Sequence, residues 1–315
     1  METVSICMIT YNHEKYIESA IKSVLAQITS FTIKLYIGED FSNDGTRRIC
    51  QTYQRNFPDQ VELLPSNKNL GMIPNFVQTL QACDGKYIAL LEGDDFWTDP
   101  NKLQKQIDFL ETNDEYIMCF HDAFKLDEIG TGKTGERTIN KDERADISTE
   151  DLLIRNRANT LTVVFRNNVL KTYPDWLYTF NGADRFLYLL LSQYGKIKYL
   201  PFVGATYRLH SGGISNFKRK PESVDVLINH YKDRIRANET LNRHFNFQYE
   251  NLISTIIKDY AIQSFLLYFY TRDYGGCKNI ISQYKLRIFS SLNYKYQLKF
   301  ILVSLAGNFK KEKKK

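Results

Sequence analysis

Strand-like and helix-like segments alternate through the first 125 residues, and this alternation constrains the fold more than any other feature. Apolar runs typical of strands occupy residues 4–10, 33–38, 61–64, 87–91 and 116–120. Helical patterns separate them, at residues 16–27, 46–55, 74–82 and 100–111. Because a strand followed by a helix and another strand usually forms a parallel pair, the pattern predicts an α/β fold with a mostly parallel, Rossmann-like sheet flanked by helices.

The rest of the chain predicts a second half of this α/β region and a helical extension. Residues 127–147 are polar and contain three glycines, which indicates an exposed loop. A strand at 161–165, a helix at 182–193 and a strand pair at 196–208, interrupted at Pro201, follow. Beyond residue 223 helical periodicity dominates, at residues 224–245, 248–270 and 273–283. We therefore expect an α/β domain over 1–217, with halves at about 1–125 and 126–217, and a helical extension over 218–315.

Composition points to a globular protein of a reducing compartment. The 315 residues are 43% hydrophobic, enough for a sizeable core. The five cysteines are an odd number without a Cys-x-x-Cys pair, which argues against a disulfide framework and against a thiolate zinc site. No signal-peptide pattern and no apolar run of about 18 residues is visible. We expect a cytoplasmic protein, either soluble or peripheral on the inner face of the membrane.

The charge is concentrated at the C-terminus. The net charge is +6, and five of the last six residues are lysine, directly after an amphipathic segment at 294–309. Two interpretations stay open: attachment to an anionic membrane surface, and a solvated terminus. Sedimentation with anionic vesicles, with and without residues 294–315, separates them. The basic residues lack the aromatic platform and the motifs of nucleic-acid binders, so we expect no nucleic-acid partner.

A carboxylate cluster follows the apolar run at residues 87–91. Glu92, Asp94 and Asp95 come where the predicted strand ends, which is where open α/β sheets bind ligands. Acidic oxygens suit a hard divalent cation, and such a cation suits a diphosphate. The alternative is a polar loop that caps the next helix, for which Asp99 is the expected N-cap and Pro100 the first helical residue.

Other motifs identify a family. The dinucleotide-binding fingerprint and the Walker loop are absent after the first predicted strand. Instead the chain carries, in order, the segments 10–16 (TYNHEKY), 38–46 (GEDFSNDGT), 69–71 (NLG) with Asn75, 92–95 (EGDD) and 207–210 (YRLH). Together these resemble the family 2 glycosyltransferases of the GT-A fold, over about residues 3–215. The resemblance implies an inverting enzyme that moves a sugar from a nucleotide-sugar donor, with Mn²⁺ or Mg²⁺.

The resemblance implies nucleotide contacts in the first half, the donor half. Asp40 matches the family aspartate that binds the base, and a carboxylate can accept a hydrogen bond from the N3–H of uracil. Its alternative role is to organise the turn at residues 42–45. Thr10 and Tyr11 lie where the family's first loop touches the nucleoside, although Tyr11 could equally be a packing residue.

The resemblance also assigns the metal and the diphosphate. Asp94 matches the second acid of the Asp-x-Asp motif and is the expected metal ligand. Glu92 stands at the first position, where its longer side chain leaves a direct metal contact and a ribose or water-mediated contact both open. His210 is expected to complete the metal site or contact the diphosphate, and Arg208 to offer it charge. We assign no role to His13 or His121.

Asp184 matches the family's catalytic base in the second half, the acceptor half. An inverting displacement needs one carboxylate within reach of the acceptor hydroxyl, and the alternative is an acidic residue placed favourably at a helix N-terminus. The expected reaction is transfer from a UDP-sugar to a glycan or lipid-linked glycan. The rivals are a nucleotidyltransferase, whose Gly-rich basic loop is absent at residues 10–16, and a non-catalytic glycan-binding scaffold, for which Glu92 in place of Asp is the only sign.

Overall fold

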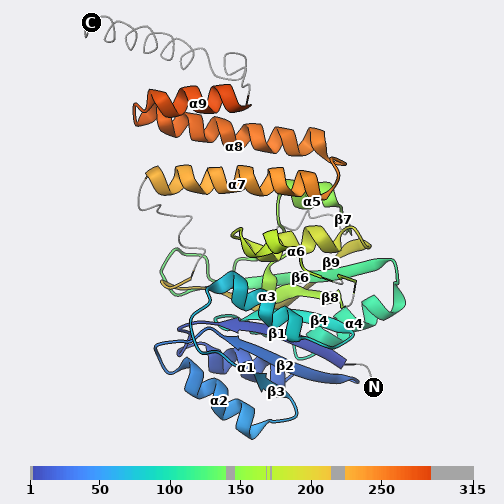
Figure 1. The fold of residues 1–315 in the computed structure, drawn as a ribbon. Coiled ribbons are helices and arrows are strands. Elements are labelled where there is room, and N and C mark those ends of the chain that lie inside the picture. Colours follow the sequence, from blue (N-terminus) through green and yellow to red (C-terminus); the bar gives the residue numbers. More distant parts are fainter. Residues whose placement is uncertain (1–2, 140–145, 168, 171, 214–223, 285–315) are drawn as a thin grey trace, which may run out of the picture. The chain divides into compact units, whose positions relative to one another are not determined.

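The computed structural model describes residues 3–139, 146–167, 169–170, 172–213 and 224–284. The chain forms two compact units, Met1–Lys218 and Arg219–Lys315, which we describe separately (Figure 1).

The first unit is built on one nine-stranded sheet, counted over the described residues. Its strands lie in the order β3-β2-β1-β4-β8-β6-β9-β5, with β7 paired to β9. Strands β5, β7 and β8 run antiparallel to their partners, and the remaining strands share one direction. The predicted α/β fold with a mostly parallel sheet is confirmed. The strands are β1 (Thr3–Thr10), β2 (Thr32–Glu39), β3 (Val61–Leu63), β4 (Tyr87–Glu92), β5 (Phe96–Trp97), β6 (Tyr116–Asp127), β7 (Asp146–Ile147), β8 (Val163–Arg166) and β9 (Lys196–Leu209).

Helices flank this sheet, and their apolar faces make its core. Helix α1 buries residues spaced by three and four, the signature of one helical face: Ile17, Ala20, Ile21 and Val24. Strand β4 is buried on both faces from Tyr87 to Leu91, as expected of a central parallel strand. The helices are α1 (Ile17–Leu25), α2 (Thr46–Asn56), α3 (Met72–Ala82), α4 (Lys102–Thr112), α5 (Thr149–Ile154) and α6 (Ala183–Leu191), with 3₁₀ turns at Thr160–Thr162 and Asp175–Tyr178.

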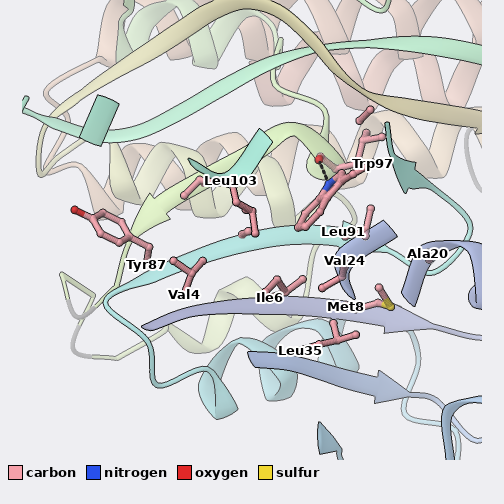
Figure 2. Packing of buried hydrophobic residues seen from close by; sticks show 14 of the residues in the cluster. Val4, Ile6, Met8, Ala20, Val24, Leu35, Tyr87, Leu91, Trp97 and Leu103 are labelled. Atoms are coloured by element: carbon pink, nitrogen blue, oxygen red, sulfur yellow. Dashed lines mark hydrogen bonds between the residues drawn. The ribbon is translucent and has the colours of Figure 1, made fainter. Parts of the chain in front are cut away.

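The core ties the two halves of the sheet together. Figure 2 shows the side chains of Ile6 and Met8 on β1 beside Leu91 on β4 and Trp97. The Trp97 indole N–H donates to the Leu161 carbonyl oxygen at 2.8 Å, which satisfies its polar atom inside the core (Figure 2). Strands β1 and β4 are parallel neighbours in the sheet, so their carboxyl ends lie side by side.

Three expectations about element boundaries were wrong. Helix α4 begins at Lys102 with Asn101 as its N-cap, so Asp99 and Pro100 precede it; the Asp99 carboxylate instead accepts a hydrogen bond from the Asn101 N–H at 2.9 Å. Strand β6, predicted to end at residue 120, continues to Asp127, where the expected loop begins. Strand β9 is unbroken, because a register shift against β6 between the pairs Phe120–Tyr199 and Asp122–Val203 accommodates Pro201, which has no N–H to donate.

The second unit consists, in its described part, of helices α7 (Val224–His244), α8 (Glu250–Tyr270) and α9 (Tyr274–Tyr284). A small core joins them, made of Ile235, Ala261, Phe265, Phe269, Cys277 and Ile280. The helical extension is confirmed. Among the helices of the described residues, none has both the length and the apolar character needed to cross a bilayer. The amphipathic segment at 294–309 and the lysine tail lie outside the described residues.

Candidate functional site

The carboxyl ends of β1, β4 and β9 bring the predicted motifs to one place. Ile9 on β1 pairs with Glu92 on β4, and the Gly93 N–H donates to the Ile9 carbonyl oxygen at 2.9 Å. A Cβ on residue 93 would lie 2.6 Å from Thr10 Oγ1, so only glycine allows this approach. The carboxylate loop that follows therefore lies against the loop after β1.

Asp94 is the centre of a side-chain cluster. Its Oδ2 lies 2.9 Å from His210 Nε2 and 3.8 Å from His13 Nε2. The potential ligand atoms of these three residues all lie within 4.8 Å of one another. The predicted partners Asp94 and His210 are thus brought together, and His13, which the sequence analysis left without a role, joins them.

The charges of this cluster are coupled. Burial alone would raise the pKa of Asp94, but the hydrogen bond from His210 and the nearby His13 imidazole hold that pKa below its usual value. Burial lowers the pKa of His13, against the opposing effect of the Asp94 charge. The carboxylate therefore stays ionised at neutral pH, and burial favours the neutral imidazole at His13, which is the form that coordinates a metal.

A second network holds this cluster in place. The Arg208 guanidinium donates from Nε to the Asp94 carbonyl oxygen at 2.8 Å and from Nη1 to Glu128 Oε1 at 2.8 Å. The Tyr16 hydroxyl donates to the other oxygen of Glu128 at 3.0 Å, and the Tyr16 ring lies 4.6 Å from that of His210. We call Arg208, Glu128 and Tyr16 the Arg208 network.

These contacts give Arg208 a positioning role. Its side chain is only 10% exposed, and its backbone N–H donates to Asp95 Oδ1 at 2.7 Å. Asp95 is accordingly structural, as its buried position also indicates. The predicted contact between Arg208 and the diphosphate gains no support from this arrangement and stays a prediction.

The predicted nucleotide residues Asp40, Thr10 and Tyr11 lie at the same edge of the sheet. Both oxygens of the Asp40 carboxylate accept backbone hydrogen bonds, from Leu70 N at 2.7 Å and Gly71 N at 2.9 Å. Asp40 thus fastens the loop at 69–71, whereas Glu39 and Asp44 organise the turn at 42–46. Tyr11 is 39% exposed, which makes it a surface residue and not a packing residue.

The buried Glu92 carboxyl is affected by the charges of both Asp94 and Asp184. Burial first, then the negative charge of Asp94 and the smaller effect of Asp184, raise the pKa of Glu92 to about 8. Within the described residues, Glu92 Oε2 is buried without a hydrogen-bond partner. Asp184, in the first turn of α6, accepts a hydrogen bond from Asn156 Nδ2 at 3.2 Å. The charge of the predicted base thus acts on Glu92, the residue that also feels the charge of Asp94; its catalytic role stays a prediction.

The donor set fits a divalent cation. One ionised carboxylate and two imidazole nitrogens converge from three different segments, namely the loops after β1, β4 and β9. Carboxylate and neutral imidazole are both common ligands of divalent metals. Glu92 is the weaker candidate, because its raised pKa keeps its proton on at neutral pH.

Comparison with known proteins identifies the family. The model of glycosyl transferase family 2 matches residues 5–171, more than half of the 315 residues. The chain belongs to glycosyl transferase family 2. The predicted family and the glycosyltransferase class of the domain are thereby confirmed.

One relative and two solved structures show how far the similarity extends. Uncharacterized protein Rv1520 of Mycobacterium tuberculosis is 36% identical over 67% of this chain and 60% of its own length. TarS 1-349 of S. aureus in complex with UDP has a TM-score of 0.54 at 17% identity and covers 93% of both chains. The mannosyltransferase PcManGT of Pyrobaculum calidifontis, in complex with GDP-Man and Mn²⁺, has a TM-score of 0.55 at 10% identity, over 98% of this chain and 87% of its own. These structures share the fold, and the match to Rv1520 spans about three fifths of that protein.

Proposed function

We propose that this chain transfers a sugar from a UDP-sugar to a hydroxyl of a glycan or lipid-linked glycan, with inversion at the anomeric carbon. The observation that carries the proposal is the convergence of His13, Asp94 and His210. In addition, the charge of Asp184 acts on the neighbouring Glu92. The two solved structures support a nucleotide-sugar donor, because they contain UDP in one case and GDP-Man with Mn²⁺ in the other.

The residues divide the work of such a reaction. Asp94 and His210 would hold Mn²⁺ or Mg²⁺, which when bound neutralises charge on the departing diphosphate. Asp184 would accept the proton of the acceptor hydroxyl as its oxygen attacks the anomeric carbon. The bond from that carbon to the diphosphate breaks on the opposite face, and the nucleoside diphosphate leaves with the electron pair. Asn156 keeps the Asp184 carboxylate in place by its hydrogen bond.

The experiment that tests this function is the variant Asp184→Asn, assayed for transfer from a panel of UDP-sugars with Mn²⁺ present. General-base catalysis contributes about 10²- to 10⁴-fold, so transfer should fall by that factor while UDP affinity stays within about twofold of wild type. Asp175→Asn, an exposed carboxylate of the 3₁₀ turn before α6, is the matched control. Native transfer by Asp184→Asn with normal UDP binding would remove the base assignment.

Calorimetry with UDP separates the enzyme from its rivals. A metal-dependent transferase binds UDP more tightly when Mn²⁺ is present, and a glycan-binding scaffold has no reason to show this linkage. A nucleotidyltransferase would instead form a nucleotide-sugar from a sugar phosphate and UTP. The anionic membrane surface as a partner, and the cytoplasmic location, stay predictions from the sequence.

A further inference from the structure

His13 provides an imidazole that the sequence motifs do not assign. Its Nε2 is the atom that faces Asp94, and the His13 side chain is 18% exposed, against 6% for His210. The two imidazole rings meet nearly edge to face, with centroids 6.0 Å apart and an interplanar angle of 85°. Two nitrogen donors and one carboxylate oxygen therefore surround one point at the edge of the sheet.

The second ring nitrogen of His13 has an oxygen partner, the hydroxyl of Thr10. The other ring nitrogen, Nδ1, lies 3.2 Å from Thr10 Oγ1. Metal-binding histidines usually donate their second ring N–H to a neighbouring oxygen, which fixes the tautomer and turns the free lone pair toward the metal. In the tautomer whose Nδ1–H donates to Thr10, the lone pair of Nε2 faces Asp94 and is available to a metal. Thr10 is 2% exposed and belongs to β1, so this support is rigid.

The loop that carries His13 is also fastened to its neighbour. The His13 N–H donates to Thr46 Oγ1 at 2.8 Å, and the Asn12 N–H donates to Ser42 Oγ at 2.9 Å. Asn12 has a φ of 55°, a left-handed conformation that such contacts stabilise. Because the loop is held in place before any ion binds, His13 pays little conformational entropy when it coordinates.

We propose that His13 is the third protein ligand of the metal site, and that its imidazole makes the site prefer Mn²⁺ to Mg²⁺. Mg²⁺ favours oxygen ligands in near-ideal octahedral geometry and keeps several waters. First-row transition metals accept imidazole readily, and a set of two histidines and one carboxylate is typical of them. The proposal rests on the metal part of the proposed function, but its test does not depend on sugar transfer.

The test measures metal binding to the full chain directly. Mn²⁺ alone is titrated into the protein while the electron paramagnetic resonance signal of the free ion is followed, and Mg²⁺ is then added as a competitor. Wild type should bind Mn²⁺ at least about tenfold more tightly than Mg²⁺. His13→Gln should lose at least about 10- to 100-fold in Mn²⁺ affinity, the loss typical even for an outer-shell partner of a ligand, with a much smaller change for Mg²⁺.

Two further variants sharpen the result. His13→Asp replaces nitrogen by oxygen and should move the preference toward Mg²⁺. His244→Gln, an exposed histidine of α7, is the matched control and should bind both ions as wild type does. Thermal melting without metal checks that the variants are folded.

An unchanged ratio of Mn²⁺ to Mg²⁺ affinity in His13→Gln would overturn the proposal. The same measurement separates this inference from the proposed function. If Mn²⁺ affinity depends on His13 but the chain transfers no sugar, His13 stays a metal ligand and the proposed transferase function is rejected. Sugar transfer by a chain whose Mn²⁺ affinity is the same with and without His13 would support the proposed function and reject His13 as a metal ligand.

Discussion

Two groups of polar side chains lie in the same α/β unit, one partly buried and one fully buried, and they differ in how their atoms are satisfied. In the first, the ligand atoms of His13, Asp94 and His210 face one another within 4.8 Å. In the second, Lys102, Gln106 and His121 are fully buried, and each carries one polar atom without a hydrogen-bond partner among the described residues. We call the first group the ligand cluster and the second the core cluster.

The difference lies in where each group can find a partner. The ligand cluster is partly open to solvent, and a cation can offset the cost of gathering its donors. In the core cluster, Lys102 Nζ lies over the Trp97 ring at 3.9 Å, a cation–π contact that compensates only part of the lost hydration. Burial accordingly lowers the pKa of Lys102 and that of His121 far below their usual values. Under the proposed function, metal binding accounts for the first group, whereas we expect the second to lower stability.

The largest expected effect is on the ligand cluster. Asp94→Asn removes the one anionic donor, and transfer should fall by about 10²- to 10³-fold, because the stabilisation of charge on the departing group is lost. Thermal stability without metal should hardly change. Steady-state kinetics at saturating Mn²⁺ measure the loss, and Asp108→Asn, an exposed carboxylate of α4, serves as the control. Full turnover by Asp94→Asn would mean that the ligand cluster is not needed for transfer, and the functional difference between the two clusters would disappear.

The core cluster should respond in the opposite way. Lys102→Met keeps the unbranched chain as far as the Cε position and removes the buried amine, so the free energy of unfolding at pH 7 should rise by about 1 to 3 kcal/mol. Urea unfolding measures this gain, and transfer should be unchanged. Lys22→Met, at an exposed lysine paired with Glu18, should shift stability by less than about 0.5 kcal/mol. A clear loss of stability in Lys102→Met would mean that the amine makes an interaction that stabilises the folded state.

The gain from Lys102→Met should also depend on pH. The folded pKa of Lys102 is lowered, so between the folded and unfolded pKa values the unfolded chain binds more protons and wild-type stability rises with pH. The advantage of the variant should therefore be larger at pH 7 than at pH 9.5, and it should vanish above the ordinary pKa of lysine of about 10. Urea midpoints at pH 7 and pH 9.5 test this; a constant difference would contradict it.

The smallest effect is expected in the Arg208 network. Glu128→Gln keeps the shape but removes the charge that Arg208 contacts, and Glu128 is about one-third exposed. Exposed pairs contribute little, so Mn²⁺ affinity should fall only about two- to fivefold. Glu136→Gln, which breaks the exposed pair with Lys125, is the control. An unchanged Mn²⁺ affinity in Glu128→Gln would show that the Arg208 network does not position the ligand cluster.

Much of the fold was predictable because its signals are local. Periods of two and of 3.6 residues mark β1 to β4 and α1 to α3 within a few positions. The length of β6 and the continuity of β9 were not predictable, since they depend on pairing between segments about eighty residues apart. Similarly, the Asp99–Pro100 pair satisfies a capping pattern, yet the helix begins after it.

The site was predictable where motifs exist and not where chain segments merely converge. Asp94 and His210 were expected from the family's sequence pattern, and the structure brings them together. His13 and Glu128 acquire their roles only from the meeting of the ends of β1, β4, β6 and β9. A local signal existed for His13, namely its place three residues after Thr10, but nothing in that spacing says which carboxylate it faces.

Gly93 has a consequence for how this site can vary. The N–H of Gly93 donates a hydrogen bond to the Ile9 carbonyl oxygen of β1. A side chain at residue 93 would clash with Thr10. The separation of the segments that carry His13 and Asp94 is thus a property of the backbone. Ligands on either segment can be exchanged, and metal preference retuned, while the distance between their attachment points stays the same.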